Sequence, residues 1–328
     1  MKQNSQKETL PQPAVALEKS TVDLSIIIPI YNEEGNIEIL YKRLREVLNP
    51  LGKVFEIIFI NDGSTDASEV HLTKLYHENP ETIRVIHFSR NFGHQLALTA
   101  GLNHSQGDAA VILDADLQDP PELITQFVKE WEQGFEIVYG LRTEREGETF
   151  FKTYTASLFY KLIRATTAID IPENVGDFYL LDRKVINILN ALKERHRFIR
   201  GLVAWSGFRR KAVEYVRKSR HAGKTKYSLW KMVKFSFDAM TSFSFAPLRF
   251  VSVLGAIFSL ISFMAILLII YLKLFTDATI VGWSSMMAVI LFIGGIQLLS
   301  LGIIGEYVAR IGDDVKSRPL YTIKQFLN

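Results

Sequence analysis

The sequence predicts an α/β domain with a mainly parallel β-sheet, followed by two membrane-spanning helices. Three observations lead to this fold class. Short β-branched apolar runs alternate with helix-length amphipathic segments from residue 24 onward, which is typical of a parallel sheet covered by helices on both faces. Two long stretches near the end of the chain carry no charge. Of the 328 residues, 48% are hydrophobic and 22% are charged, so the chain is too apolar for a disordered protein.

The elements of the α/β domain follow one another in strand–helix order. Strands are expected at residues 24–30, 55–60, 83–88, 109–113 and 137–139. Helices are expected at about 36–48, 67–77 and 93–104. Ligands of such sheets bind beyond the carboxyl ends of the strands, so functional side chains should directly follow each strand.

Two uncharged segments, Phe250–Leu272 and Ala278–Gly305, are each long enough to cross a bilayer, because about 20 helical residues span its hydrocarbon core. Two core helices of a globular domain are the alternative, but such helices are usually shorter and have a polar face. Residues 197–249 carry 13 Lys and Arg against two acidic residues, whereas the loop Lys273–Asp277 has one charge of each sign. The positive-inside rule therefore predicts a multi-pass protein of the inner (cytoplasmic) membrane with a cytoplasmic α/β domain.

These features divide the chain into five parts. Residues 226–245 place aromatic side chains at helical spacing beside lysines, which indicates an amphipathic helix at the bilayer interface. Residues 149–166 show a similar pattern, and packing on the sheet fits them equally well. The expected parts are a disordered tail (1–22), a cytoplasmic α/β domain (23–225), an interfacial amphipathic helix (226–246), two transmembrane helices (247–308) and a cytoplasmic C-terminal tail (309–328).

Cysteine content and net charge exclude several classes of site. The chain has no cysteine, which excludes disulfides, thiolate metal sites and a cysteine nucleophile. Any metal must therefore be held by oxygen or imidazole ligands. The formal net charge is only +3, so the composition does not indicate a nucleic-acid-binding protein.

Acidic and polar residues follow three of the predicted strands. IPIYNEE (28–34) ends the first strand, NDGSTD (61–66) follows the second, and DADLQDPPE (114–122) follows the fourth. Carboxylates gathered at this edge of a sheet suit two purposes: hydrogen bonding to a ribose or base, and holding a hard divalent ion that neutralises a diphosphate. Taken singly, each segment also fits an ordinary turn or helix cap.

Together with GHQLALTAGL (93–102), these segments resemble family 2 glycosyltransferases of the Rossmann-like GT-A fold. They are most similar to the polyprenyl-phosphate glycosyltransferases of the dolichol-phosphate-mannose-synthase-like group, and among these to bacterial glucosyltransferases. The resemblance extends from about Leu24 to the end of the chain and implies a nucleotide site with a divalent cation, Mg²⁺ or Mn²⁺. The implied metal ligands are Asp114, Asp116 and Gln118. The implied nucleotide-binding residues are Pro29, Tyr31, Glu33, Asp62, Asp114, Ala115, Asp116, Arg220, Lys224 and Lys226.

Segments further along extend the resemblance: GLR (140–142), VGDF (175–178), RHRFIRGLVAW (195–205) and RHAGKTKYSL (220–229). The implied catalytic residues are Asp177, Arg142 and Arg220. In the family, the segment of Asp177 puts an acid near the acceptor phosphate. A phosphate monoester is already largely dianionic at neutral pH and does not strictly need a base, so we interpret this acid as orienting the acceptor or the sugar, with a general base as the alternative role. His94 is expected to serve only at the start of its helix.

The resemblance implies an inverting enzyme that moves a hexose to a polyprenyl phosphate at the cytoplasmic membrane face, with UDP-glucose as the first choice of donor. The alternatives are GDP-mannose or another UDP-sugar as donor, and a membrane-anchored scaffold that only binds nucleotide sugars. The Gln-x-x-Arg-Trp motif of processive polysaccharide synthases is absent. The implied partners are the donor, the lipid phosphate and the membrane, and not nucleic acid. Glycines of the second span would permit a homo-oligomer through the transmembrane helices.

Overall fold

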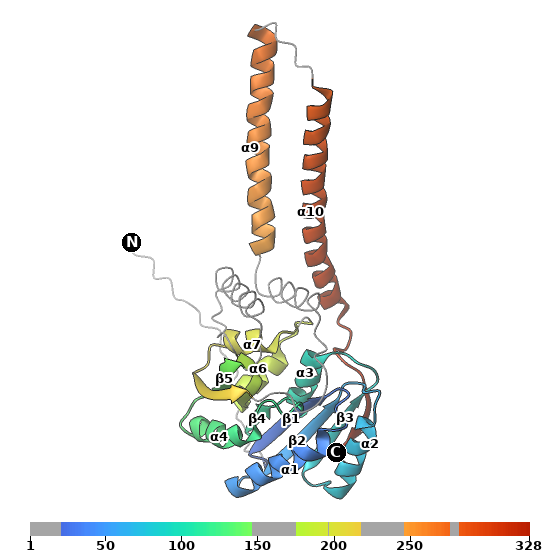
Figure 1. Ribbon diagram of the computed structural model, residues 1–328, viewed down its shortest axis with the longest axis vertical. Helices are drawn as coiled ribbons and strands as arrows, with labels where there is room; N and C mark the ends of the chain where they lie inside the picture. Colours follow the sequence, from blue (N-terminus) through green and yellow to red (C-terminus); the bar gives the residue numbers. More distant parts are fainter. Residues whose placement is uncertain (1–20, 146–174, 196, 218–245, 276–281) are drawn as a thin grey trace, which may run out of the picture.

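The computed structural model describes residues 21–145, 175–195, 197–217, 246–275 and 282–328. Figure 1 shows an α/β domain at one end and two long helices that extend away from it side by side. The predicted disordered tail, the 149–166 segment and the interfacial helix lie almost entirely outside the described residues.

The α/β domain is built on one mixed sheet. Its strands are β1 (Leu24–Ile30), β2 (Phe55–Asn61), β3 (Ile83–Phe88), β4 (Ala109–Ile112), β5 (Ile137–Arg145), β6 (Val175–Asp182), β7 (Arg210–Arg217) and β8 (Ile323–Leu327). They are ordered β7-β5-β6-β4-β1-β2-β3-β8. Strands β4, β1, β2 and β3 are parallel, as are β5 and β7, whereas β6 and β8 run antiparallel to their neighbours. The predicted α/β fold with a mainly parallel sheet is confirmed.

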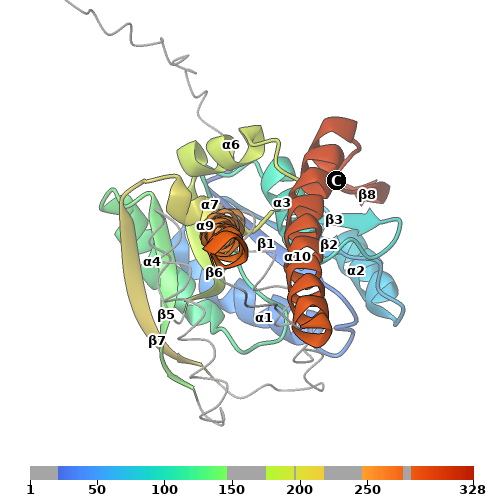
Figure 2. The same ribbon diagram turned by 90° about the horizontal axis from the view of Figure 1, so that it is seen from above.

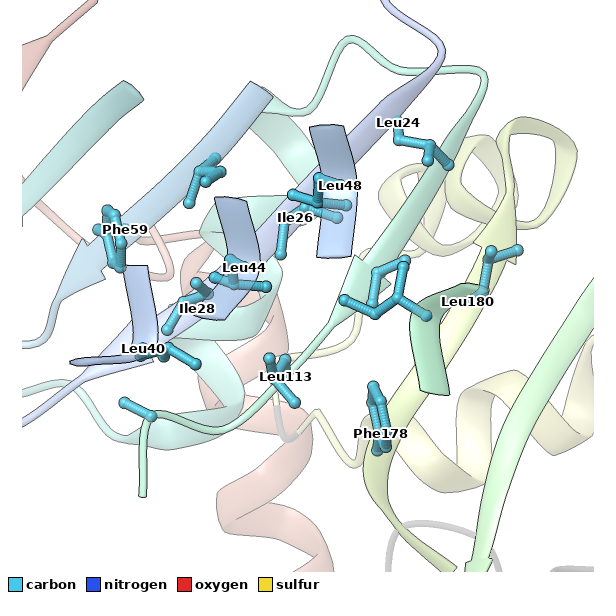
Figure 3. Packing of buried hydrophobic residues seen from close by; sticks show 14 of the residues in the cluster. Leu24, Ile26, Ile28, Leu40, Leu44, Leu48, Phe59, Leu113, Phe178 and Leu180 are labelled. Carbon is cyan, nitrogen blue, oxygen red and sulfur yellow. The ribbon is translucent and has the colours of Figure 1, made fainter. Parts of the chain in front are cut away.

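Helices cover both faces of this sheet. They are α1 (Ile37–Leu48), α2 (Ser68–Glu78), α3 (His94–His104), α4 (Ile124–Glu132), α6 (Arg183–Ala191) and α7 (Ile199–Trp205), with the long helices α9 (Ala246–Phe275) and α10 (Trp283–Lys316) beyond the domain. Leu24, Ile26 and Ile28 of β1 pack with residues of α1, α2 and α4 in one core, partly shown in Figure 3. Ile27 faces the opposite core, formed with α3, α6 and α7. Burial on both faces explains why β1 is apolar apart from Ser25, and it makes the sheet a rigid support for the loops at its edge.

The two uncharged segments fall largely within α9 and α10. Among the described residues, one stretch, Phe292–Lys316, meets the length and composition required to cross a membrane, and its apolar 18-residue window is not buried inside the protein. The arrangement of two spans stays a prediction.

Residues 309–328 differ from the expected tail. Helix α10 continues to Lys316, and β8 then pairs antiparallel with β3 at the edge of the sheet (Figure 2). The register places Val85 opposite Leu327 and His87 opposite Gln325. A five-residue strand with only three apolar residues has little periodicity of its own, and its partner β3 lies far away in the sequence. The pattern of the segment alone therefore did not indicate a strand.

Candidate active site

Most of the predicted site residues that the structure describes lie in loops at the carboxyl ends of β1, β2 and β4. Strand β6 runs antiparallel to β4, so its first residues lie at this same edge, and the end of β5 lies there too. Among the described residues, a positive φ at a non-glycine position occurs at Asn32, Leu117 and Ser317. The first two belong to the loops after β1 and β4, and such unfavourable backbone conformations often gather at functional sites.

The loops after β1 and β2 are held together by hydrogen bonds. Asn32 Oδ1 accepts a bond from the backbone N–H of Thr65 at 2.8 Å, and the backbone N–H of Asn32 donates to Ser64 Oγ at 3.0 Å. Within this frame Pro29 is buried in β1, Glu33 is half-buried and Tyr31 is 39% exposed. Of these three predicted nucleotide-binding residues, Tyr31 is therefore the most exposed and the most accessible to a ligand.

Asp62 fixes the loop that leads into α3. Its Oδ1 accepts from the backbone N–H of Phe92 at 2.7 Å, and its Oδ2 accepts from that of Gly93 at 3.0 Å. Asp62 is buried, and burial raises the pKa of its carboxyl despite these two bonds. Gly63 has φ +64°, and a side chain there would come within 2.5 Å of Asn91 N. The loops after β2 and β3 are therefore packed backbone to backbone.

That packing delivers His94 to a position between two carboxylates. Its Nε2 lies 3.2 Å from Asp177 Oδ2 and 3.7 Å from Asp114 Oδ1. Burial by itself lowers the pKa of His94, but Asp114 and Asp177 outweigh it and raise the pKa to about 9. A cationic imidazole is thus placed between the first aspartate of the Asp-x-Asp motif and the predicted acceptor-side acid. The role expected from the sequence, at the helix start alone, is too narrow.

The Asp-x-Asp motif fits a divalent cation. Asp114 Oδ1 is buried without a hydrogen-bond partner among the described residues. Burial raises the pKa of Asp114 to about 6, against the opposing effect of His94, and repulsion from Asp177, Asp119 and Asp116 adds to the rise. The negative charges of Asp177, Asp119 and Asp116 favour a cation at this oxygen for the same reason that they favour a proton there. The donors are the hard oxygens that Mg²⁺ and Mn²⁺ prefer.

The predicted ligand set is nevertheless incomplete by itself. Asp116 is 8% exposed and its Oδ1 accepts from the backbone N–H of Gln118 at 3.2 Å, while Ala115 between the aspartates is buried. No cluster of three or more His, Asp or Glu side chains suited to a metal occurs within the described part of the chain. Such a set is typical of a cation that takes its remaining ligands from substrate phosphates and water.

Asp177 is held by three side chains on two helices. Arg200 of α7 forms a two-pronged ion pair with it, Nε to Oδ1 at 2.6 Å and Nη2 to Oδ2 at 3.1 Å. His94 and, at 3.5 Å, Gln95 of α3 approach Oδ2. Burial opposes ionisation, but Arg200 and His94 outweigh it and hold the pKa of Asp177 well below its usual range. Asp177 is therefore a permanently ionised carboxylate at neutral pH.

Arg142 reaches the Asp-x-Asp loop through a separate network. Its Nε donates to the hydroxyl of Tyr215 at 3.0 Å, its Nη2 lies 3.4 Å from Asp119 Oδ2, and the Tyr215 hydroxyl donates to Asp119. A side-chain carbon at Gly176 would overlap the guanidinium of Arg142. The glycine before Asp177 thus makes room for Arg142.

The structure links some predicted residues and leaves others apart. His94 links Asp114 to Asp177. Asp119 links Arg142 to the Asp-x-Asp loop. Asp62 does not take part in these links and contacts the loop before α3 instead. Five side-chain partners were not among the predicted site residues: His94, Gln95, Asp119, Arg200 and Tyr215. The first four lie within the family-like segments, so the sequence pointed to their segments but not to the individual residues. Three predicted cations lie outside the described residues: Arg220, Lys224 and Lys226.

Comparison with known protein families accounts for most of the chain. Residues 25–189 match the family described as "Glycosyl transferase family 2", and residues 246–311 match "GtrB C-terminal hairpin". The first match contains the sheet edge with its aspartates, and the second contains most of α9 and α10.

Individual relatives align over nearly the full length. An uncharacterized glycosyltransferase of Bacillus subtilis (strain 168), YkcC, is 50% identical over 93% of this chain and 94% of its own. The SfII prophage-derived bactoprenol glucosyl transferase of Shigella flexneri is 40% identical over 92% of this chain and 97% of its own. The crystal structure of glucosyl-3-phosphoglycerate synthase from Mycobacterium tuberculosis with Mn²⁺, UDP-glucose and phosphoglyceric acid is 18% identical, with a TM-score of 0.45 over 67% of this chain and 79% of that chain.

Proposed function

This chain belongs to glycosyl transferase family 2 and is a glycosyltransferase, and we propose that it moves a glucosyl group from UDP-glucose to a polyprenyl phosphate. The transfer inverts the anomeric carbon and takes place at the cytoplasmic face of a membrane. The observation that carries this proposal is the pairing of Asp177 with Arg200 and His94 beside Asp114, whose Oδ1 has no hydrogen-bond partner among the described residues.

In the proposed reaction an oxygen of the acceptor phosphate attacks the anomeric carbon, and the bond from that carbon to the diphosphate breaks. The products are the lipid phosphosugar and UDP. A phosphate monoester, with a second pKa of about 6, is largely dianionic at neutral pH, so no proton has to be removed from the nucleophile. Asp177 cannot readily serve as a proton acceptor either, because its ion pair with Arg200 holds its pKa well below its usual range. Its role in the proposal is to fix Arg200 and His94, two cationic groups suited to an anionic acceptor.

Asp114, Asp116 and Gln118 would hold the divalent cation, which supplies charge compensation for the departing diphosphate. Arg142 forms an ion pair with Asp119 of this loop and adds positive charge at the same edge of the sheet. Arg220, Lys224 and Lys226 keep their proposed contacts with the nucleotide diphosphate, on the strength of the sequence motif alone.

The choice of donor and acceptor is supported by the relatives and the hairpin. Several relatives 38–40% identical to this chain are named bactoprenol glucosyl transferase or its homolog, which points to glucose and to a lipid acceptor. An uncharged hairpin next to the catalytic domain supports an acceptor that lies in a bilayer.

One assay tests donor, acceptor and metal together. The full chain, purified in detergent, is incubated with a polyprenyl phosphate and with radiolabelled UDP-glucose or GDP-mannose, in Mg²⁺, Mn²⁺ or a chelator. We expect organic-extractable label only with UDP-glucose, lipid and metal present, and none with Asp116→Asn. If only GDP-mannose gave label in the lipid phase, the proposed donor would be wrong. If UDP-glucose gave free glucose and no lipid product, the proposed acceptor would be wrong.

The proposed topology places the catalytic domain and residues 309–328 in the cytoplasm. Because the chain has no cysteine, single cysteines at Thr276 and Ser317 can be labelled selectively. An impermeant thiol reagent added to intact cells should modify the first and spare the second, and the reverse pattern would contradict the proposed orientation.

A further inference from the structure

The segment that follows α10 returns to the catalytic domain and closes the edge of its sheet. Ser317, with φ +48°, ends the helix, and Ile323–Leu327 then pairs with β3. An ion pair between Lys324 Nζ and Glu69 Oε1, 2.9 Å long, ties the strand to α2. The chain therefore connects the long helix directly to the edge strand of the domain.

Tyr321 contacts the last residue of β3 and the last turn of α3. Its ring stacks on Phe88 at the end of β3, with centroids 5.0 Å apart and an interplanar angle of 18°. Its hydroxyl accepts a hydrogen bond from Asn103 Nδ2 near the end of α3, at 3.0 Å. The next carbonyl, of Thr322, accepts from the backbone N–H of Ser89 at 3.0 Å. One short segment thus holds the end of the strand, the start of the loop and the helix.

The loop held in this way is the one that places His94 and Gln95 against Asp177. Phe92 within it packs edge-on to Phe88, the ring that Tyr321 stacks on, with centroids 5.5 Å apart. Asp62 holds the loop from the other side through the amides of Phe92 and Gly93. The position of α3 and its first two side chains therefore depends on contacts from two directions.

The end of α10 also contacts the segment before α7. Asp314 Oδ1 accepts from the backbone N–H of Arg195 at 3.3 Å, and the guanidinium of Arg195 donates to the carbonyl of Arg318. Helix α7 begins four residues after Arg195 and carries Arg200. Both segments that supply partners to Asp177 are therefore attached to the end of α10 or to the residues that follow it.

We propose that Tyr321 is a positioning residue, which fixes the β3–α3 loop, and with it His94 and Gln95 against Asp177, relative to helix α10. It acts through Phe88 and Asn103 and touches no substrate. The inference goes beyond the proposed function, because it concerns the geometry of the Asp177 cluster whichever sugar and acceptor are used.

The test compares Tyr321→Ala, Tyr321→Phe and the control Lys324→Ala in the full chain. Alanine removes the stacked ring and the hydroxyl, phenylalanine keeps the ring, and the control removes the exposed ion pair of β8 with α2. Hydrogen exchange of peptides covering 89–96 is measured beside kcat and donor KM. Loss of one stacked pair and one hydrogen bond should speed exchange and lower kcat about tenfold in Tyr321→Ala. Donor KM should change less than kcat: Asp62 contacts the loosened loop through the amides of Phe92 and Gly93, whereas Tyr31 and Glu33 lie on a different loop.

We expect Tyr321→Phe to recover most of the wild-type exchange and kcat, and Lys324→Ala to match wild type in both. Wild-type exchange in 89–96 or wild-type kcat in Tyr321→Ala would overturn the inference. An equal effect of Lys324→Ala, or faster exchange throughout the domain, would also overturn it, since any loosening of β8 would then suffice. A wrong assignment of donor or acceptor would appear differently, as an inactive wild-type chain, and the exchange measurement would still decide the role of Tyr321.

Discussion

Asp177→Asn distinguishes an orienting carboxylate from a general base. Among the described residues, Oδ2 of Asp177 faces donors from Arg200, His94 and Gln95, whereas Oδ1 faces Arg200 Nε alone, at 2.6 Å. The asparagine should therefore keep its oxygen at the Oδ2 position and turn its amide toward Arg200 Nε, losing one charge-assisted bond. That bond is worth about 1.5–3 kcal/mol, which corresponds to a loss of roughly 10- to 100-fold in kcat.

The pH profile separates this outcome from loss of a base. With a polyprenyl phosphate as acceptor, the acid limb of kcat/KM should follow the second ionisation of the lipid phosphate near ~6, in wild type and in Asp177→Asn alike. Arg200→Lys, which keeps the carboxylate but not the two-pronged pairing, should give a comparable loss and serves as the control. A fall of about 10⁴-fold in Asp177→Asn, with Asp177→Glu restoring activity and moving the acid limb, would refute the orienting role.

Three further predictions concern the metal, a glycine and a buried histidine. Asp116→Ala should lower turnover by orders of magnitude and abolish Mn²⁺ binding in the presence of UDP, measured by electron paramagnetic resonance; retained binding would remove Asp116 from the ligand set. Gly176→Ala should displace Arg142 and lower the melting temperature in detergent through loss of about 1.5–3 kcal/mol of charged hydrogen bonding, while Gly35→Ala, with open space around it, should not. Burial lowers the pKa of His87 below its unfolded value of 6.5, so the protein should be stable with respect to this group above pH 6.5 and lose stability as the pH falls below it. If the melting temperature of His87→Gln fell with decreasing pH as much as that of the wild type, His87 would not be the cause.

Much of the fold follows from the sequence because the parallel strands are buried on both faces. The expected strands at 24–30, 55–60, 83–88 and 109–113 agree with β1 to β4 within a residue, and the three expected helices begin within a residue of α1 to α3. Strand β7 was not predicted, because its outer edge position permits a polar sequence such as RKAVEYVR. Strand β8 depends on pairing with a distant strand, which local periodicity does not show.

The site was predicted at the level of segments more than of contacts. A strand end followed by acids locates Asp114 and Asp116 at the sheet edge, whereas Asp177, near the start of β6, was implied by the family resemblance alone. The identity of their cations depends on side-chain packing between helices: Arg200 reaches Asp177 from α7, and His94 reaches it from α3. Several basic residues occur in these segments, and the sequence gives no distances that show which of them pairs with Asp177.

The pairing of β3 with β8 also sets an order of events during biosynthesis. Both long helices lie between these strands in the chain, so the ribosome completes α9 and α10 before β8 exists. Until then β3, whose residues other than Arg84 are buried in the finished domain, has an unpaired backbone edge that can recruit strands from other chains. Pairing across so long a sequence separation is also slow. A nascent chain that stalls before β8 is made therefore keeps this strand edge unpaired and open to aggregation, so the enzyme domain is protected only after both long helices have been synthesised.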